Sequence, residues 1–218
     1  MPETILTISS RNYSSWSLRG WLLARMSGLP FEVKALAADD AAALDELMLR
    51  SSSILVPNLL HDGILVWDTL AIAEYLHEVC PQAGMFPADR AARARCRSIS
   101  GEMHSGFGAL RSALPMNLRA HRPGFRILSA ARMDIERILT IWRDCLAEWK
   151  GPWLFGEQRC AADAMYAPVV TRLLTYDVTL DAACTAYCER TMAVPDMQDW
   201  VALAKNEVEE LAELDVEF

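Results

Sequence analysis

The order of apolar runs restricts the fold of this chain more than any other feature of its sequence. Strand-like and helix-like runs alternate up to Val79 in the order β-α-β-α-β-β-α. A linker with one glycine and two prolines follows at Pro81–Pro87, and only helix-like runs come after it. Because a β-α-β unit implies parallel strands with a right-handed crossover, we expect an α/β domain over residues 1–80 and an all-α domain over residues 88–218.

Glycine and proline residues predict where the helices, turns and strands of the first domain begin and end. Gly28 supplies a stop for the first helix, and Asp62-Gly63 between two apolar runs is a strong hairpin signal. Pro57 opens the third strand because proline cannot donate to a sheet ladder, and base rates alone favour a trans peptide bond before it. The expected strands are Thr4–Ser9, Phe31–Leu36, Ile54–Leu60 and Ile64–Trp67, and the expected helices are Ser15–Met26, Ala41–Leu49 and Leu70–Val79.

Helical spacing of apolar residues continues through the second domain. The first of its helices ends at Pro115 and contains Gly106 and Gly108, which each cost about 1 kcal/mol of helix propensity. The expected helices are Ala91–Leu114, Ile127–Trp149, Ala161–Thr175, Leu180–Thr191 and Asp196–Leu211.

Composition and charge exclude several classes of function. The net charge of −8, from 21 basic and 29 acidic residues, disfavours non-specific binding to nucleic acid. No apolar run approaches the roughly 18 residues that a membrane span needs, and Met1–Thr4 lacks the features of a signal peptide. The six cysteines form no C-x-x-C pair and have no zinc-finger spacing. We therefore expect a cytoplasmic protein with reduced cysteines and no metal.

A group of hydroxyl side chains marks the start of the first helix. Tyr13, Ser14, Ser15 and Ser17 stand where the first strand passes into that helix. A serine there accepts hydrogen bonds from the free N–H groups of the first turn, and the same helix start attracts anions. From this stretch alone, capping is the commoner explanation. Stabilisation of a bound thiolate, oxyanion or carboxylate is the alternative.

Two further features fall on the same edge of the α/β domain. In a fold of thioredoxin type, Val56-Pro57 and Asp68-Thr69 converge with the serine-rich helix start at the carboxyl end of the parallel strands. Together they offer a hydroxyl, a backbone amide and carbonyl, and an acidic helix cap. That set suits a small peptide, whose carboxylate meets helix N–H groups and whose ammonium meets Asp68.

Four motifs resemble those of the cytosolic glutathione S-transferases, over nearly the whole chain. Ser14–Arg19 is similar to the Ser-Ser-Cys-Ser-x-Arg start of zeta-class, serine-type enzymes. Val56–Leu59 resembles the family's V-P-x-L, and Asp68–Leu76 resembles its (E/D/Q)-S-x-A-I-x-x-Y-L. Gly156 with Ala162-Asp163 resembles the capping motif of the helical domain. The resemblance implies a bacterial-type enzyme with a thioredoxin-like N-terminal domain, an all-α C-terminal domain and a cis proline in V-P-x-L.

The resemblance also implies a role for each matching residue. The Ser14 hydroxyl would donate to the glutathione sulfur, with Ser15 as the backup, and so favour the nucleophilic thiolate. The segment Leu55-Val56-Pro57 would line the cysteinyl part of glutathione, which pairs with the Val56 backbone. Asp68 and Thr69 would hold the γ-glutamyl end. On this interpretation, capping of the helix falls to Ser15 or Ser17 rather than to Ser14.

The second substrate should bind where the helical domain faces the cleft. Its candidate contacts are Met103, His104, Phe107 and Arg111. For His104 the commoner explanation is a hydrogen-bonded interface histidine. Core packing is the commoner explanation for Met103 and Phe107. Arg111 meets either an anionic substrate or an acidic partner.

Three positions depart from the zeta-class pattern. Trp16 replaces a cysteine near the thiol. Cys160 stands where the capping motif has serine or threonine, which predicts a cap weaker by about 1 kcal/mol. Thr175 falls about where the isomerases of that class place a substrate-binding arginine, with Arg172 one turn earlier. That departure counts against a maleylacetoacetate isomerase.

The resemblance therefore favours a glutathione transferase that activates the thiol of glutathione for attack on a small electrophilic substrate, as in detoxification. The alternatives are a glutathione-dependent isomerase of the maleylacetoacetate isomerase type and a non-catalytic module that binds glutathione or a partner. A thiol-disulfide oxidoreductase is disfavoured because no cysteine lies in Ser14–Ser17. The resemblance also implies a cytoplasmic homodimer with glutathione as cosubstrate and with no metal, nucleic-acid or membrane partner.

Overall fold

One mixed sheet forms the base of the α/β part of the molecule. The computed structural model describes residues 4–36 and 55–208. Its strands form a sheet in the order β2-β1-β3-β4. β1 pairs with β2 in parallel and with β3 in antiparallel fashion, and β3 and β4 are antiparallel. The strands are β1 (Thr4–Ile8), β2 (Glu32–Ala35), β3 (Asn58–His61) and β4 (Ile64–Trp67). This is the thioredoxin-like arrangement that the order of elements predicts, although β3 begins at Asn58 rather than Ile54.

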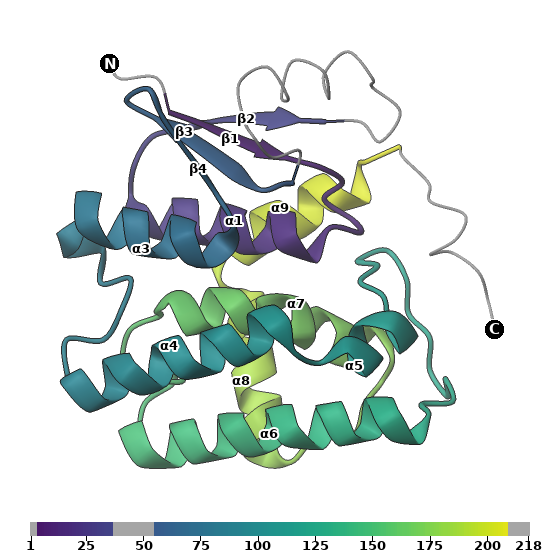
Figure 1. Cartoon of the computed structure of the whole chain (residues 1–218). Coiled ribbons are helices and arrows are strands. Elements are labelled where there is room, and N and C mark those ends of the chain that lie inside the picture. Colours follow the sequence, from purple (N-terminus) through teal and green to yellow (C-terminus); the bar gives the residue numbers. More distant parts are fainter. Residues whose placement is uncertain (1–3, 37–54, 209–218) are drawn as a thin grey trace.

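Two helices, α1 (Ser15–Ser27) and α3 (Thr69–Val79), cover one face of this sheet (Figure 1). Gly28 ends α1 in the left-handed conformation with a φ of 75°, and its N–H donates to the Arg25 carbonyl. The turn between β3 and β4 has a φ of 51° at Asp62 and 78° at Gly63. Both the helix stop and the hairpin are therefore confirmed.

The helical part is organised around α7 (Ala161–Thr175), which lies directly against α1 (Figure 1). Every residue of α7 except Leu174 is buried. The other elements are η1 (Pro81–Ala83), α4 (Arg90–Ser105), α5 (Gly108–Ala113), α6 (Ser129–Trp149), α8 (Ala182–Ala193) and α9 (Pro195–Lys205). Within the described ranges, none of the helices has the length and apolar character needed to cross a membrane. The exact division of the chain at residues 80 and 88 stays a prediction.

Asp163 fixes the start of α7. The Cys160 N–H donates to Oδ2 of Asp163 at 2.9 Å, and the Leu154 N–H and the Tyr187 hydroxyl donate to Oδ1 at 3.2 and 3.0 Å. Burial raises the pKa of Asp163, and these hydrogen bonds oppose the rise. The hydrogen bond from the Cys160 N–H to the Asp163 carboxylate, which the capping motif predicts, is therefore present. The energetic cost of a thiol at Cys160 stays a prediction.

The structure corrects the expected helix Ala91–Leu114, which is broken into α4 and α5. The Gly106 N–H donates to the Glu102 carbonyl at 2.8 Å and ends α4. Phe107 then adopts a φ of 59°, and its side chain is buried. A new helix begins because Oδ2 of Asp134, on α6, accepts a hydrogen bond from the Leu110 N–H at 2.9 Å.

The last helix is shorter than expected, because α9 ends at Lys205 rather than Leu211. The end of that prediction, beyond residue 208, lies outside the described residues. The predicted helix Ala41–Leu49 also lies outside them.

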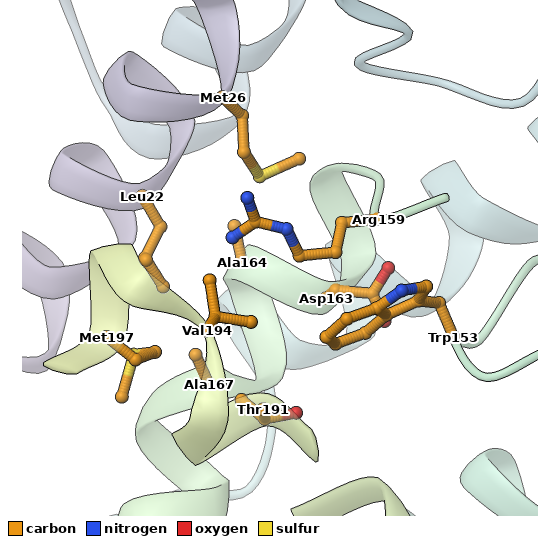
Figure 2. Close-up of a pocket in the computed structure, with 10 residues that line it drawn as sticks. All are labelled: Leu22, Met26, Trp153, Arg159, Asp163, Ala164, Ala167, Thr191, Val194 and Met197. Atoms are coloured by element: carbon orange, nitrogen blue, oxygen red, sulfur yellow. The ribbon is translucent and has the colours of Figure 1, made fainter. Parts of the chain in front are cut away.

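A small cavity marks the junction of α1 with α7 and the segment between α8 and α9 (Figure 2). Its volume is about 10 Å³, which is room for roughly one water molecule. Arg159 extends along one side of it toward Met26 (Figure 2), and its Nη2 lies 3.0 Å from Oδ2 of Asp196. A cavity of this size is too small for a substrate.

Candidate active site

A cleft of about 310 Å³ opens between the α/β part and the last turn of α4. It lies at the N-termini of α1 and α3, beside the loop that leads into β3. Its lining residues are Trp16, Leu55, Val56, Pro57, Trp67, Asp68, Thr69 and His104. The cleft therefore contains every residue expected to contact the cysteinyl and γ-glutamyl parts of glutathione, together with His104.

Ser14 is the N-cap of α1. Its Oγ accepts a hydrogen bond from the Ser17 N–H at 3.2 Å and donates to Oγ of Ser17 at 2.9 Å. Oγ of Ser17 also accepts from the Ser9 N–H at 3.0 Å. The expectation that Ser15 or Ser17 caps this helix is therefore wrong, because Ser15 is already the first helical residue. The cap itself uses an oxygen lone pair of Ser14 rather than its proton. The hydroxyl proton rotates to suit its partner, so Ser14 can donate to a sulfur in place of Oγ of Ser17.

Remote segments hold the loop that leads to Ser14. Oε2 of Glu207 accepts hydrogen bonds from the Ser10 hydroxyl at 2.6 Å and from the Asn12 N–H at 2.9 Å. The Asn12 side chain accepts from the Leu118 N–H at 2.8 Å and donates to Asn117 at 3.0 Å. The start of α1 is thus fixed by contacts with the helical part, not only by its own sequence.

Asp68 stands at the N-terminus of α3 with a φ of 75°. Its Oδ1 accepts a hydrogen bond from the Leu70 N–H at 2.8 Å, and its Oδ2 lies 2.5 Å from Nε2 of His104. His104 is therefore a hydrogen-bonded residue between the helical part and the α/β part, as expected from the sequence.

Thr69 carries an unused polar group into the same cleft. The residue is 1% exposed, and its Oγ1 has no hydrogen-bond partner among the described residues. A buried hydroxyl without a partner is costly, so this atom fits a ligand that would accept or donate at that point.

The peptide bond between Val56 and Pro57 is cis, as the resemblance implies. Pro57 packs closely on α1: a Cβ added at Gly20 would lie 2.6 Å from both Cβ and Cγ of the proline. Glycine at this position therefore permits the approach of the Val56–Pro57 loop to the start of α1. Leu55 is 68% exposed at the rim of the cleft.

Trp16 forms the boundary between the cleft and a group of arginines. Its ring centroid is 5.0 Å from that of His104, 4.6 Å from Cζ of Arg19 and 4.8 Å from Cζ of Arg111. Cation–π contacts of this kind hold a ring in place. Burial lowers the pKa of both guanidinium groups.

Other predicted residues lie outside the cleft lining. Met103 and Phe107 are 1% and 7% exposed and belong to the hydrophobic core. Arg111 does not line the cleft, although it contacts two residues that do: its guanidinium lies over the Trp16 ring, and its Nη2 donates to the carbonyls of Met103 and of the cleft residue His104. Trp67 lines the cleft but was not among the predicted contacts. Its position directly before the Asp68-Thr69 cap indicates that it would lie at the cleft.

Arg19, which supports the cleft through its contact with the Trp16 ring, is a second residue without a predicted role there. It is 2% exposed, and its Nε donates to the Met165 carbonyl at 2.8 Å. A charged residue on the same helix face as Trp16, Leu22 and Leu23, three or four positions away, was the available signal.

Sequence and structure comparisons assign this arrangement to a known family. The family model "Glutathione S-transferase, N-terminal domain" matches residues 13–79, and "Glutathione S-transferase, C-terminal domain" matches residues 90–204. A probable maleylacetoacetate isomerase of Caenorhabditis elegans is 27% identical over 161 residues, which are 73% of this chain and 74% of the relative. Glutathione S-transferase 1 of Dianthus caryophyllus is 26% identical over 172 residues, 78% of each chain.

A solved structure has the same fold. It is a glutathione transferase homolog from Burkholderia with bound glutathione, which superposes with a TM-score of 0.72 at 24% identity and covers 95% of this chain and 100% of its own. Two consecutive domain matches and the shared fold lead to one conclusion: the chain belongs to the glutathione S-transferase family.

Proposed function

We propose that the protein is a glutathione transferase that activates the glutathione thiol for attack on a small electrophile. One observation carries the proposal: a single cleft brings the Val56–Pro57 backbone, Asp68 and the unpartnered hydroxyl of Thr69 to the capped start of α1. A γ-glutamyl tripeptide needs an acidic group for its ammonium, helix-start N–H groups for its carboxylate and an extended backbone partner. The cleft offers all three.

Each residue has a distinct role in this proposal. The Val56 backbone pairs with the cysteinyl part, and Asp68 and Thr69 hold the γ-glutamyl end. The Ser14 hydroxyl donates to the sulfur, which lowers the pKa of the thiol because the hydrogen bond favours the charged form. The resulting thiolate is the nucleophile. Ser15 remains the alternative donor, since it is the next residue and begins α1.

Isomerisation is the second candidate function. It is favoured by the similarity to a probable maleylacetoacetate isomerase. Both reactions need the same glutathione thiolate, so they differ only in the second substrate. Assays with 1-chloro-2,4-dinitrobenzene and with a cis-dienoic diketo acid, each with and without glutathione, separate them.

A melting experiment with glutathione tests the shared step. A ligand at about 100 times its Kd stabilises the native state by about 2.7 kcal/mol, which raises Tm by roughly 5–10 °C in a chain of this size. We expect this shift with glutathione and with S-methylglutathione, and a much smaller one with cysteinylglycine, which lacks the γ-glutamyl group. No shift with any of the three would favour the non-catalytic module.

We also propose a cytoplasmic homodimer. Three apolar side chains of β4 and α3 are unusually open: Ile64 is 53% exposed, and Trp67 and Val79 are each 40% exposed. Burial of such side chains against a second copy would stabilise the pair. Light scattering after gel filtration should give twice the chain mass of 24.3 kDa. A mass of one chain contradicts the proposal.

A further inference from the structure

One carboxylate, from the segment that follows α9, holds the loop between β1 and α1. Oε2 of Glu207 accepts hydrogen bonds from the Ser10 hydroxyl at 2.6 Å and the Asn12 N–H at 2.9 Å. Oε1 accepts from the Arg11 N–H at 2.8 Å. Hydrogen bonds to an ionised acceptor are roughly twice as strong as neutral ones. Three consecutive residues of the loop are therefore bound by one half-buried side chain.

Ser10 connects this carboxylate to the start of α1. Its Oγ, which donates to Glu207, also accepts a hydrogen bond from the Tyr13 N–H at 3.1 Å. Its carbonyl accepts from the Ser14 N–H at 3.1 Å. The backbone at Ser14 is therefore held by Ser10, and the side chain of Ser10 is held by Glu207.

Two further side chains give Glu207 a defined position. Nη1 of Arg119 donates to the Glu207 carbonyl at 2.9 Å, and its Nη2 donates to the Tyr13 hydroxyl at 2.8 Å. Nε1 of Trp200, on α9, donates to the Arg11 carbonyl at 3.0 Å. Because α9 also packs beside α1 (Figure 1), the carboxylate is joined to the loop on a rigid support.

A second carboxylate of the C-terminal segment contacts the other end of α1. Oδ1 of Asp196, in the first turn of α9, accepts a hydrogen bond from Nε of Arg25 at 2.9 Å. Arg25 belongs to the last turn of α1, away from the Ser14 cap. Asp196 thus binds the same helix without contact to the serine end, which makes it a matched control for Glu207.

We propose that Glu207 is a positioning residue for activation of the glutathione thiol. Glu207 does not line the cleft, and it acts through Ser10 on the place of the Ser14 hydroxyl. A hydrogen bond weakens steeply as its length and angle depart from the optimum, and the bond from Ser14 lowers the pKa of the thiol by favouring its charged form. The proposal rests on the transferase or isomerase function proposed above, since both need the same thiolate.

Titration of bound glutathione tests this role without any electrophile. Glu207→Gln keeps the size of the side chain but places an NH₂ donor where an oxygen accepts from the loop. The thiolate is followed by its ultraviolet absorbance in the full chain saturated with glutathione. We expect a thiol pKa below the ordinary value of about 8.5 in the wild-type chain, and a value about one unit higher in Glu207→Gln. The Kd for glutathione should change little.

The control variant separates positioning from general stability. Asp196→Asn should leave the pKa of the bound thiol unchanged, whatever its effect on Tm. An equal rise of that pKa in Asp196→Asn would mean that any loosening of α1 suffices, and it would overturn the specific role of Glu207. A lower Tm in Glu207→Gln with no change in the thiol pKa would show a purely structural residue and also overturn the proposal.

A second variant tests the connection through Ser10. Ser10→Ala removes the hydroxyl that joins Glu207 to the Tyr13 N–H, so it should raise the thiol pKa as Glu207→Gln does. The double variant should raise it no further, because both changes break one connected path. Fully additive shifts would show that the two residues act independently and would reject the path through Ser10.

Amide hydrogen exchange reports the contact itself. In Glu207→Gln the Arg11 and Asn12 amides should exchange faster than in the wild-type chain, because both lose a charged acceptor. Unchanged exchange at both amides would mean that Glu207 does not hold the loop, and the proposal would be wrong.

The pH dependence of turnover distinguishes failure of this role from failure of the proposed function. At saturating glutathione, kcat/KM for 1-chloro-2,4-dinitrobenzene follows the ionisation of the bound thiol. In Glu207→Gln it should fall about tenfold well below the thiol pKa and change little above it. A lowered wild-type thiol pKa that Glu207→Gln leaves unchanged rejects the positioning role alone. A thiol pKa near the ordinary value in the wild-type chain rejects activation by Ser14 and the role of Glu207 together.

Discussion

Nε2 of His104 lies 2.5 Å from Oδ2 of Asp68, which joins the last turn of α4 to the first turn of α3. The other carboxylate oxygen of Asp68 caps α3 through the Leu70 N–H at 2.8 Å. Both oxygens are therefore oriented before any ligand arrives. The side chains remain 39% and 30% exposed, for Asp68 and His104 respectively, so a ligand can reach them.

The coupling of this pair gives the first prediction. Asp68→Asn keeps a good N-cap but removes the negative charge, so we expect glutathione affinity to fall about tenfold, as for loss of a partly exposed charge-assisted hydrogen bond. His104→Gln should cost less, because it only loosens the orientation of Asp68. Calorimetric titration of glutathione into each variant measures both effects. The double variant should bind no more weakly than Asp68→Asn, and fully additive losses would contradict a shared role.

Ser14 has two roles that substitution can separate. Ser14→Ala removes the cap and the hydroxyl, so it should lose about 1 kcal/mol of stability and about 10–100-fold in kcat/KM for conjugation. Ser14→Gly should show the same fall in kcat/KM. Its free energy of unfolding should fall by only about a few tenths of a kcal/mol, because glycine is tolerated at an N-cap. Glutathione affinity should change little in either. Urea denaturation and steady-state kinetics measure the two effects.

Ser15→Ala is the matched control for that pair of variants. It should retain both stability and activity, because Ser15 lies inside the helix rather than at its cap. If activity is lost in Ser15→Ala and kept in Ser14→Gly, the sulfur contact belongs to Ser15.

The contact between Gly20 and Pro57 sets the third prediction. A Cβ at residue 20 would lie 2.6 Å from two atoms of the proline ring, so Gly20→Ala should cost about 1–3 kcal/mol through overpacking. It should also weaken glutathione binding, because the displaced loop contains Val56. Gly101→Ala in α4 meets no atom within 4 Å and should stabilise the protein by up to about 1 kcal/mol. Denaturation curves of the two variants should therefore shift in opposite directions.

Buried thiols supply the fourth prediction. Burial raises the pKa of Cys145 to about 11 and that of Cys184 and Cys188 to about 12. Because only the thiolate reacts, dithiobis(nitrobenzoate) at pH 8 should leave these three unmodified in the native protein. Cys80 is the more exposed thiol and should react first. Rapid modification of all six cysteines without denaturant would contradict this expectation.

The same thiols make stability depend on alkaline pH. Their pKa is higher in the folded state than in the unfolded chain. The folded state therefore holds more protons from pH 9 to about 11 for Cys145, and from pH 9 to about 12 for Cys184 and Cys188. Their contribution is complete below pH 9 and is lost as the pH rises. The free energy of unfolding in urea should thus be lower at pH 10 than at pH 8. Cys145→Ala should show a smaller fall.

Signals between residues that are near one another in the sequence were sufficient to predict much of the fold. The αL stop at Gly28, the turn at Asp62-Gly63, the cap at Asp68 and both ends of α7 were predicted from a few neighbouring residues each. Family motifs added the cis bond before Pro57. These features depend on local φ preferences and on capping within one turn, which the sequence carries directly.

The sequence by itself therefore determined the order of the described strands, the family, and the Leu55–Pro57 and Asp68-Thr69 segments of the cleft, because each of these is encoded in short motifs. The tertiary structure decided the break between α4 and α5, which needs Asp134 of α6 to cap Leu110. It also decided the contact of His104 with Asp68 and the contact of Arg111 with the ring of Trp16. Those relationships join segments far apart along the chain, and only the packing of helices against one another and against the sheet brings such side chains within reach.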